Sequence, residues 1–193
     1  MTRYPAAETA EKHERILSEA SRLFREHGLS GVSVGDLMKA ADLTHGSFYN
    51  HFESKQALIG DCIDYVSILA VGQIGAAKPT GAGKRSFVSK YLSATARDDP
   101  GHACLMSSLG PEIAREPTAK PAMTRYVQAF IGKLVSHFPW PRPKDARGDA
   151  IRMTTSLVGA LVLARAVDDE TLSREILREV IKQFSGSGER GTG

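Results

Sequence analysis

Apolar residues recur at helical spacing along almost all of this 193-residue chain, and this periodicity limits the fold more than any other feature. A helix is expected from about residue 12 to residue 27, where one face carries Ile16, Leu17, Ala20, Leu23 and Phe24. No window alternates apolar and polar residues strictly enough, with enough β-branched residues, to predict a strand. The sequence therefore predicts an all-α protein.

Capping signals divide the first part of the chain into short helices. Gly28 stands where a left-handed C-terminal cap is needed, and Ser33 followed by Asp36 resembles a capping box that opens a helix of about two turns. Asp42 occupies the tight turn behind that helix, where a left-handed conformation is expected. Ser54 is a further N-cap, and it opens a longer helix that runs toward residue 77.

Proline and glycine mark the later boundaries. Further helices are expected at about residues 87–96, 103–115, 121–138, 145–167 and 171–184. The predicted organisation is a three-helix helix-turn-helix domain over residues 1–55, a larger helical ligand-binding and dimerisation domain over residues 56–185, and a tail over residues 186–193. The tail has four glycines among eight residues and is expected to be disordered.

Residues 43–55 combine a short amphipathic helix with a run of hydrogen-bonding side chains. Thr44 is an N-cap candidate whose hydroxyl can accept from the amides of the next turn, so that a helix begins at His45. Phe48 and Phe52 are four residues apart and can anchor that helix to a core. The outward side chains suit a DNA groove better than bulk water; they are His45, Ser47, Tyr49, Asn50 and His51, followed by Lys55.

The charge distribution shapes this DNA-binding hypothesis. The chain carries a formal net charge of +3, but residues 1–60 contain 7 Lys or Arg against 8 Asp or Glu, a balance of −1. Non-specific affinity scales with the number of phosphates neutralised, so we expect local geometry, neutral donors and two copies to supply the binding. Protonation of His45 or His51 would add charge, which predicts tighter binding at mildly acidic pH.

Composition narrows the class of protein. The N-terminus lacks the apolar run of a signal peptide, and no apolar stretch is expected to reach membrane-spanning length, so a cytoplasmic protein without membrane contact is predicted. Two cysteines, Cys62 and Cys104, cannot form a disulfide scaffold, and no two histidines have the i, i+4 spacing of a helical metal site. Neither a bound metal nor a cofactor is expected.

In their order along the chain, these features resemble the TetR family of transcriptional repressors. The most specific part is the pattern Tyr49-x-His51-Phe52-x-x-Lys55, together with its position near the N-terminus. The resemblance is good over about residues 10–60, and it continues more loosely through residues 103–110 and 159–167.

The resemblance implies roles for individual residues. It places His45, Gly46 and Ser47 at base edges, and Tyr49, Asn50, His51 and Lys55 at the phosphate backbone. Amides near Ser33 can also bind phosphate, because a helix N-terminus exposes N–H groups there. The C-terminal domain of such repressors encloses an inducer, and the candidate lining residues are Tyr65, Tyr91, Cys104, Met106, Met123, Tyr126, Phe130 and Met153.

An apolar stripe on the last two helices predicts a homodimer through a four-helix interface. Its residues are Leu157, Ala160, Leu161, Ala164, Leu172, Ile176, Val180 and Phe184. The whole chain is thus predicted to be a repressor that binds a palindromic double-stranded operator and is released by a small-molecule inducer of unknown identity.

Two other hypotheses stay open. A repressor could sense oxidants or electrophiles through Cys104, which follows His102 at the expected start of a helix, where a thiol pKa can be lowered. A small helical enzyme using Cys104 and His102, or a protein adaptor without DNA binding, is more remote, because no base, nucleophile and oxyanion donors are assembled. No catalytic residue is therefore assigned.

Overall fold

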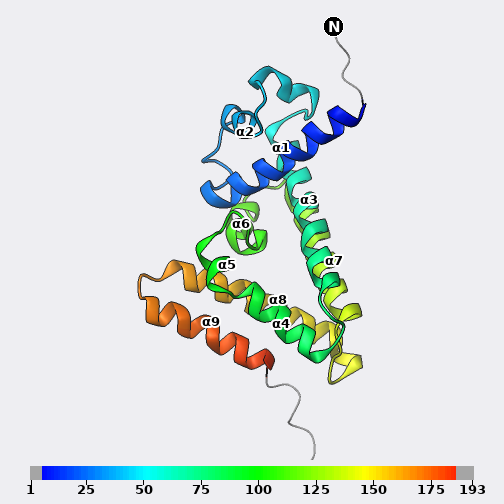
Figure 1. Cartoon of the computed structure of the whole chain (residues 1–193), viewed down its shortest axis with the longest axis vertical. Coiled ribbons are helices and arrows are strands. Elements are labelled where there is room, and N and C mark those ends of the chain that lie inside the picture. The colour runs from blue at the N-terminus through cyan, green and yellow to red at the C-terminus, as the bar shows by residue number, and fades with distance from the viewer. Residues whose placement is uncertain (1–5, 186–193) are drawn as a thin grey trace, which may run out of the picture.

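The computed structural model describes residues 6–185, and this part of the chain is helical without strands (Figure 1). The predicted all-α fold is confirmed. The helices are α1 (Ala6–His27), α2 (Val34–Ala40), η1 (His45–Asn50), α3 (Lys55–Ala76), α4 (Gly81–Tyr91), α5 (Ala94–Asp98), α6 (Leu105–Ile113), α7 (Lys120–His137), η2 (Pro143–Asp145), α8 (Ala146–Ala166) and α9 (Glu170–Ser185). The tail predicted over residues 186–193 lies outside the described residues.

The helices α1, α2 and η1 pack together at one end of the molecule (Figure 1). The expected left-handed conformations after the first two helices are present: Gly28 has a φ of 78° and Asp42 a φ of 55°. Ser33 and Asp36 form a complete capping box at the start of α2. The core of this end is buried aromatic and aliphatic side chains, namely Phe24, Leu37, Phe48 and Phe52.

Two local predictions about this end are wrong. The first helix begins at Ala6 rather than near residue 12. The third helix is a 3₁₀ helix, and Thr44 makes no side-chain cap. Instead, the Ser47 N–H and hydroxyl both donate to the Thr44 carbonyl, at 3.1 and 2.7 Å. This i to i+3 bonding is the 3₁₀ pattern, so the Thr44 backbone, not its hydroxyl, begins the helix.

The helix α3 connects this end to the rest of the molecule, and it runs beside α7 (Figure 1). It is long and apolar enough to span a membrane by length and composition alone, with a mean hydropathy of 1.5, so the expectation that no stretch reaches that length is wrong. Its apolar character has another physical reason. It packs against both α1 and α7, and seven of its residues are buried, including Leu58, Ile63 and Val66.

The helix expected at residues 87–96 is broken in two, because Leu92 ends α4 and Ser93 caps α5. The Ala96 N–H donates to the Ser93 hydroxyl at 3.1 Å. This break turns the chain toward α8 and α9, which form the far end of the molecule (Figure 1).

The apolar stripe of α8 does not lie on the surface, so its predicted place in the dimer interface is wrong. Leu157, Ala160, Leu161 and Ala164 are at most 4% exposed, because this face of α8 packs inside the chain against α6, α7 and α9. On α9, Leu172 is 41% exposed, whereas Ile176, Val180 and Phe184 are partly buried against the core. The apolar residues that α8 leaves on the surface are Ile151, Val162 and Leu163.

Candidate functional site

The polar residues of η1 form an outward-facing surface beside the tight turn at Asp42. Thr44, His45, Gly46, Tyr49 and Asn50 are exposed, and Tyr49 has 67% of its surface accessible. The buried Phe48 ring meets the Tyr49 ring edge-on, with centroids 5.3 Å apart. The helix is thus held from below by an aromatic core while its hydrogen-bonding side chains stay free for an external partner.

Nothing within the chain requires a glycine at position 46. Its φ is not positive, and a Cβ at this position would have no atom within 4 Å. A glycine that the fold does not need, on an exposed polar helix, fits the close approach of another molecule's surface. The two predicted serines differ from it, because the hydroxyls of Ser33 and Ser47 both make local hydrogen bonds within the chain.

His51 lies at the edge of this surface and is half-buried against α1. Its ring centroid is 5.9 Å from that of His13, which in turn stacks on Phe52 at 4.7 Å. Burial is the main cause that lowers the pKa of His51, followed by the nearby His13 and Lys12. Protonation of His51 is therefore opposed, which weakens its part in the expected tightening of DNA binding at acidic pH.

Lys55 has a structural role that the sequence did not suggest. Its ammonium donates to the Leu29 carbonyl at 2.6 Å and lies 5.8 Å from the centroid of the Phe24 ring. It therefore ties the start of α3 to the loop after α1. A phosphate contact by Lys55 would have to share or replace this bond.

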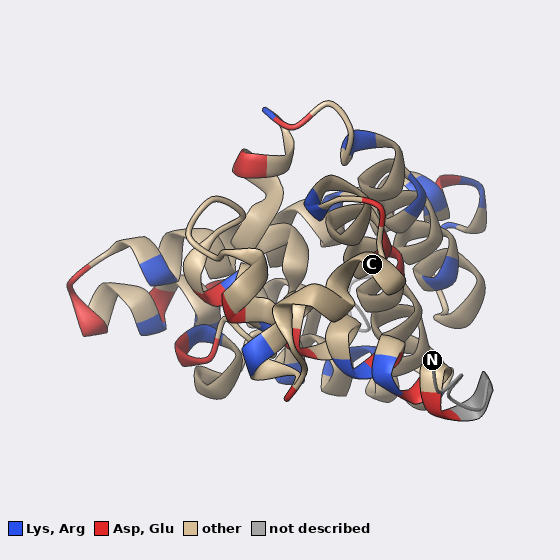
Figure 2. Cartoon of the chain, turned by 90° about the horizontal axis from the view of Figure 1, so that it is seen from above, with Lys and Arg blue, Asp and Glu red and all other residues tan. Residues whose placement is uncertain are grey.

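Charge is sparse on this surface. Neither acidic residues in the first turn nor basic residues in the last turn occur in η1. Figure 2, seen from the end that carries α1 and α2, shows basic and acidic residues interspersed along the chain rather than gathered into one basic face. Any partner is thus met mainly by neutral donors and acceptors.

A cavity of about 850 Å³ lies between α1 of this end and the helices α3, α4 and α7. Its walls come from α1, α3, α4, α7 and the segment 93–104 that leads into α6. The size is in the range of small-molecule sites. Five of the predicted lining residues lie along it: Tyr65, Tyr91, Cys104, Tyr126 and Phe130.

The three predicted methionines do not line this cavity. Met106 and Met153 are buried in the core, and Met123 packs partly buried against it. Flexible apolar side chains fill cores as readily as pockets, so residue type alone misplaced them. The contribution of α1 was not predicted: its polar face supplies Ser18, Glu19, Arg22 and Arg25 to the wall.

Cys104 lies on the cavity wall as the N-cap residue of α6, one position before the helix begins, and it is half-buried. Cys62 differs from it. Burial raises the pKa of the Cys62 thiol to about 12, which makes it an unreactive core residue.

Two contacts connect the cavity region to the loop and helix of the N-terminal end. The Leu29 N–H donates to the Glu112 carboxylate of α6 at 2.7 Å. Arg25 of α1 donates to the Ala103 carbonyl, beside Cys104, at 2.9 Å. A shift of the segment before α6 would therefore act directly on α1.

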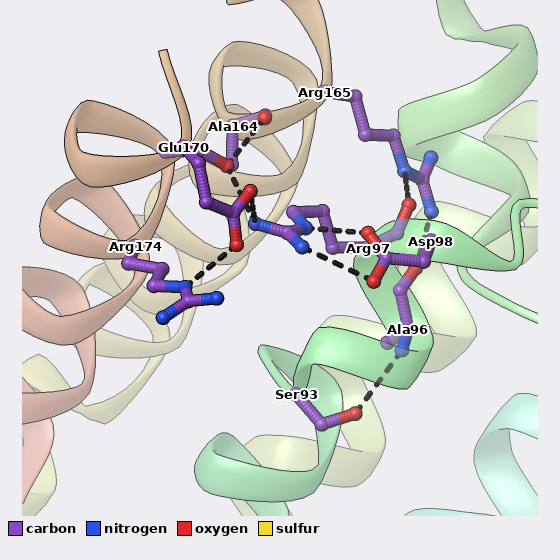
Figure 3. A network of polar contacts seen from close by, with 9 residues as sticks. Ser93, Ala96, Arg97, Asp98, Ala164, Arg165, Glu170 and Arg174 are labelled. Carbon is purple, nitrogen blue, oxygen red and sulfur yellow. Dashed lines mark hydrogen bonds and ion pairs between the residues drawn. The ribbon is translucent and has the colours of Figure 1, made fainter. Parts of the chain in front are cut away.

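A polar network holds the other side of the same segment to α8 and α9 (Figure 3). Arg97 bridges Asp98 and Glu170, and Glu170 also pairs with Arg174. Arg165 of α8 donates to the carbonyls of Ala96 and Arg97 at 2.7 and 3.0 Å. The segment is thus held to α1 near Ala103 and to α8 and α9 near Arg97.

Within residues 6–185, no group of three or more His, Cys, Asp or Glu side chains gathers in a way that could hold a metal ion.

Comparison with known proteins places the N-terminal end in a family. Residues 16–62 match the family model described as bacterial regulatory proteins, tetR family. The chain is 27% identical over 118 residues to the HTH-type transcriptional repressor DhaR of Mycobacterium sp. (strain GP1), which covers 61% of this chain and 59% of that protein. It is 39% identical over 61 residues to the regulator AcrR of Shigella flexneri, 32% of this chain and 28% of that protein. These matches span less than two thirds of the relatives' own length.

Solved structures share the fold over most of the chain. A TetR-family regulator from Agrobacterium tumefaciens superimposes with a TM-score of 0.72 at 20% identity, covering 90% of this chain and 97% of that one. The reduced form of E. coli NemR gives a TM-score of 0.69 at 19% identity, covering 90% and 95%.

Proposed function

The chain belongs to the tetR family of bacterial regulatory proteins, and we propose that it is a ligand-responsive transcriptional repressor that binds operator DNA as a homodimer. The observation that carries the proposal is the exposed, uncharged and hydrogen-bonding surface of η1, built on a buried aromatic base. Two relatives with similar sequences, DhaR and KstR2 of Rhodococcus jostii, are named as repressors. A repressor acts on chromosomal DNA, so we place the protein in the cytoplasm and assign it no catalytic activity.

In this proposal η1 enters the major groove. His45, Gly46 and Ser47 meet base edges, while Tyr49, Asn50 and His51 contact phosphates from its flank. We place the boundary of the DNA-binding domain at residue 55. Ser33, Thr44 and Lys55 are assigned supporting positions, because Ser33 caps α2, Thr44 begins η1 and Lys55 holds the Leu29 carbonyl.

A single copy carries too little positive charge for tight binding, so two copies on a palindromic site are needed. We propose that the second copy packs on the surface that α8 and α9 leave uncovered. Its apolar residues are Ile151, Val162 and Leu163 of α8 and Leu172 of α9, each at least 37% exposed. A face with this many exposed apolar residues fits a protein interface better than solvent.

The inducer would bind in the 850 Å³ cavity. Because α1 forms part of the wall, a ligand there contacts the helix on which the DNA-binding end is packed. Release of DNA requires that the ligand bind more tightly to the conformation that cannot span the two half-sites.

The test is operator affinity and its salt dependence, with operator fragments selected from genomic DNA by the purified protein. Tyr49→Phe removes one exposed hydroxyl and keeps the ring, and Tyr49→Ala removes both. We expect Tyr49→Ala to weaken binding across sequences and Tyr49→Phe to account for part of the loss. Ile68→Ala is the control, since Ile68 is 73% exposed on α3, away from η1. Unchanged affinity in both Tyr49 variants would contradict the assigned surface.

A second candidate, a thiol-sensing repressor, is favoured by one observation, the position of Cys104 on the cavity wall. Modification there would change the segment that Arg25 and Arg165 hold from either side. Cys104→Ser should then abolish release of the operator by an electrophile such as N-ethylmaleimide at low concentration. Release that survives in Cys104→Ser would remove this candidate and leave the diffusible inducer.

A further inference from the structure

Arg25 is a half-buried cation in the cavity wall that lacks an acidic partner among the described residues. Its Nε donates to the Ser21 carbonyl and one Nη to the Ala103 carbonyl, both at 2.9 Å. Burial is the main cause that lowers the pKa of Arg25, yet a guanidinium stays charged in proteins. A partly buried charge without a counter-ion is unfavourable, so the site favours an incoming anion.

The other charged residues of the wall differ from Arg25, since Arg22 is paired and Lys90 is exposed on α4 without an ion pair among the described residues. Arg22, one helical turn before Arg25, pairs with Glu19 at 2.9 Å and with Glu26 at 2.8 Å. Asp99 lies 2.9 Å from the His102 ring. Among the charged α1 residues in the wall, Arg25 is therefore the one without an ion pair, and Asp99 attracts it only at longer range.

A second donor is left open in the same cavity. The Tyr91 hydroxyl is buried and makes no hydrogen bond to another described residue. Burial, and then the neighbouring Cys104 thiol, raises the pKa of Tyr91 well above its ordinary value, so the hydroxyl stays protonated. A buried hydroxyl without a partner is rare in native proteins, and an acceptor on a ligand would satisfy it.

Much of the remaining wall is apolar, although Gln73, Ser86, Lys90 and Thr95 also line it. Val66, Leu69 and Ala70 of α3 form one wall, and Phe87 and Phe130 lie on another. These side chains cannot satisfy a polar ligand group. The cavity therefore places the Arg25 charge, which has no ion pair, and the buried Tyr91 hydroxyl beside apolar side chains that suit a hydrocarbon or aromatic body.

We propose that the effector is an organic acid in which one carboxylate, carried on an apolar body, accepts hydrogen bonds from Arg25 and Tyr91. A carboxylate is acceptor-only and matches the planar guanidinium, and one cation with one neutral hydroxyl suits a single negative charge. This inference rests on the proposed function only in taking the cavity as the effector site.

The test compares acids with their neutral amides of the same shape. Binding of decanoate and of 2-naphthylacetate to the full-length protein is measured by isothermal titration calorimetry, beside decanamide and 2-naphthylacetamide. We expect at least one acid to bind about tenfold more tightly than its amide. Arg25→Met should reduce this preference to about twofold or less, whereas the control Arg15→Met, at an exposed α1 arginine outside the cavity, should retain it.

Tyr91→Phe keeps the test valid if Arg25→Met unfolds, because it removes only an unpaired hydroxyl. The ligand-free melting temperature should not fall, while affinity for the acid should drop about fivefold. Equal affinities of acid and amide, a preference that survives Arg25→Met, or no acid binding at about 1 mM would overturn the inference. Operator binding by the ligand-free protein is measured separately, so its loss would contradict the proposed function and not the ligand class.

Discussion

Gly46 lies on an exposed helix where the fold makes no demand for glycine, since a Cβ there would meet open space. We predict that Gly46→Ala leaves the melting temperature unchanged or slightly higher, because alanine reduces the conformational freedom of the unfolded chain. Operator affinity should fall by roughly tenfold, since the new methyl group would stand where we propose that a base edge approaches. Thermal unfolding and operator titration on the same preparation separate the two effects. Wild-type affinity in Gly46→Ala would show that the DNA does not approach at this position.

His51 predicts a pH dependence of stability. Its pKa is lowered in the folded protein, so the unfolded chain binds this proton more readily. The contribution of His51 to the free energy of unfolding is therefore complete above its ordinary pKa of 6.5. This contribution is lost as the pH falls from 6.5 through the lowered pKa of His51 in the folded protein. Melting temperatures between about pH 5 and 8 should decline on the acid side, and less so in His51→Gln. A decline of the same size in both proteins would assign it to other groups.

Among single residues, the sequence predicted caps better than contacts. Ser33, Gly28 and Asp42 behave as expected, because a cap depends on neighbours within a few positions. The bond from Lys55 to the Leu29 carbonyl joins residues 26 positions apart, and no local pattern reports it.

At the scale of elements, the segment before α6 is held to the last helices by two unequal attachments (Figure 3). Arg165 is half-buried and donates to two carbonyls and to the hydroxyls of Ser107 and Ser108, at 3.2 and 3.1 Å. Glu170 is 52% exposed in its ion pair with Arg97. We predict that Arg165→Met lowers the unfolding free energy by about 1–3 kcal/mol, because it leaves buried acceptors without a hydrogen-bond donor. Glu170→Gln should change it little, since exposed pairs contribute little.

Chemical denaturation of both variants at one pH provides the comparison. If Glu170→Gln costs as much as Arg165→Met, the surface pair contributes more than its exposure allows.

The helices also show what apolar periodicity does not reveal, namely which surface covers an apolar face. Leu157 and Leu161 have the spacing of an interface stripe, and the structure buries both inside the chain. Spacing identifies a face that must be covered, but it does not identify what covers it. The polar face of α1 shows the converse, because part of it lines the cavity and apolar spacing does not indicate this.

At the scale of the whole molecule, the proposed dimer makes a direct prediction. Leu163 is 56% exposed on α8, so Leu163→Glu should not disturb the fold but should place a charge inside the proposed interface. We expect monomers in sedimentation analysis and a loss of operator affinity of roughly a hundredfold or more. Ile68→Glu, an equally drastic change on the exposed side of α3, should remain dimeric. A dimeric Leu163→Glu protein that binds DNA normally would move the interface elsewhere.

The position of α1 has a consequence for engineering. Biosensors are often assembled by exchanging the DNA-reading end of one regulator for that of another. In this protein such an exchange at residue 55 would also replace Ser18, Glu19, Arg22 and Arg25, and with them one side of the cavity. A hybrid made there would take on part of the ligand preference of the regulator that supplies the new DNA-binding end, together with its operator specificity. Restoring these four side chains in the grafted helix should give a hybrid that retains its original response.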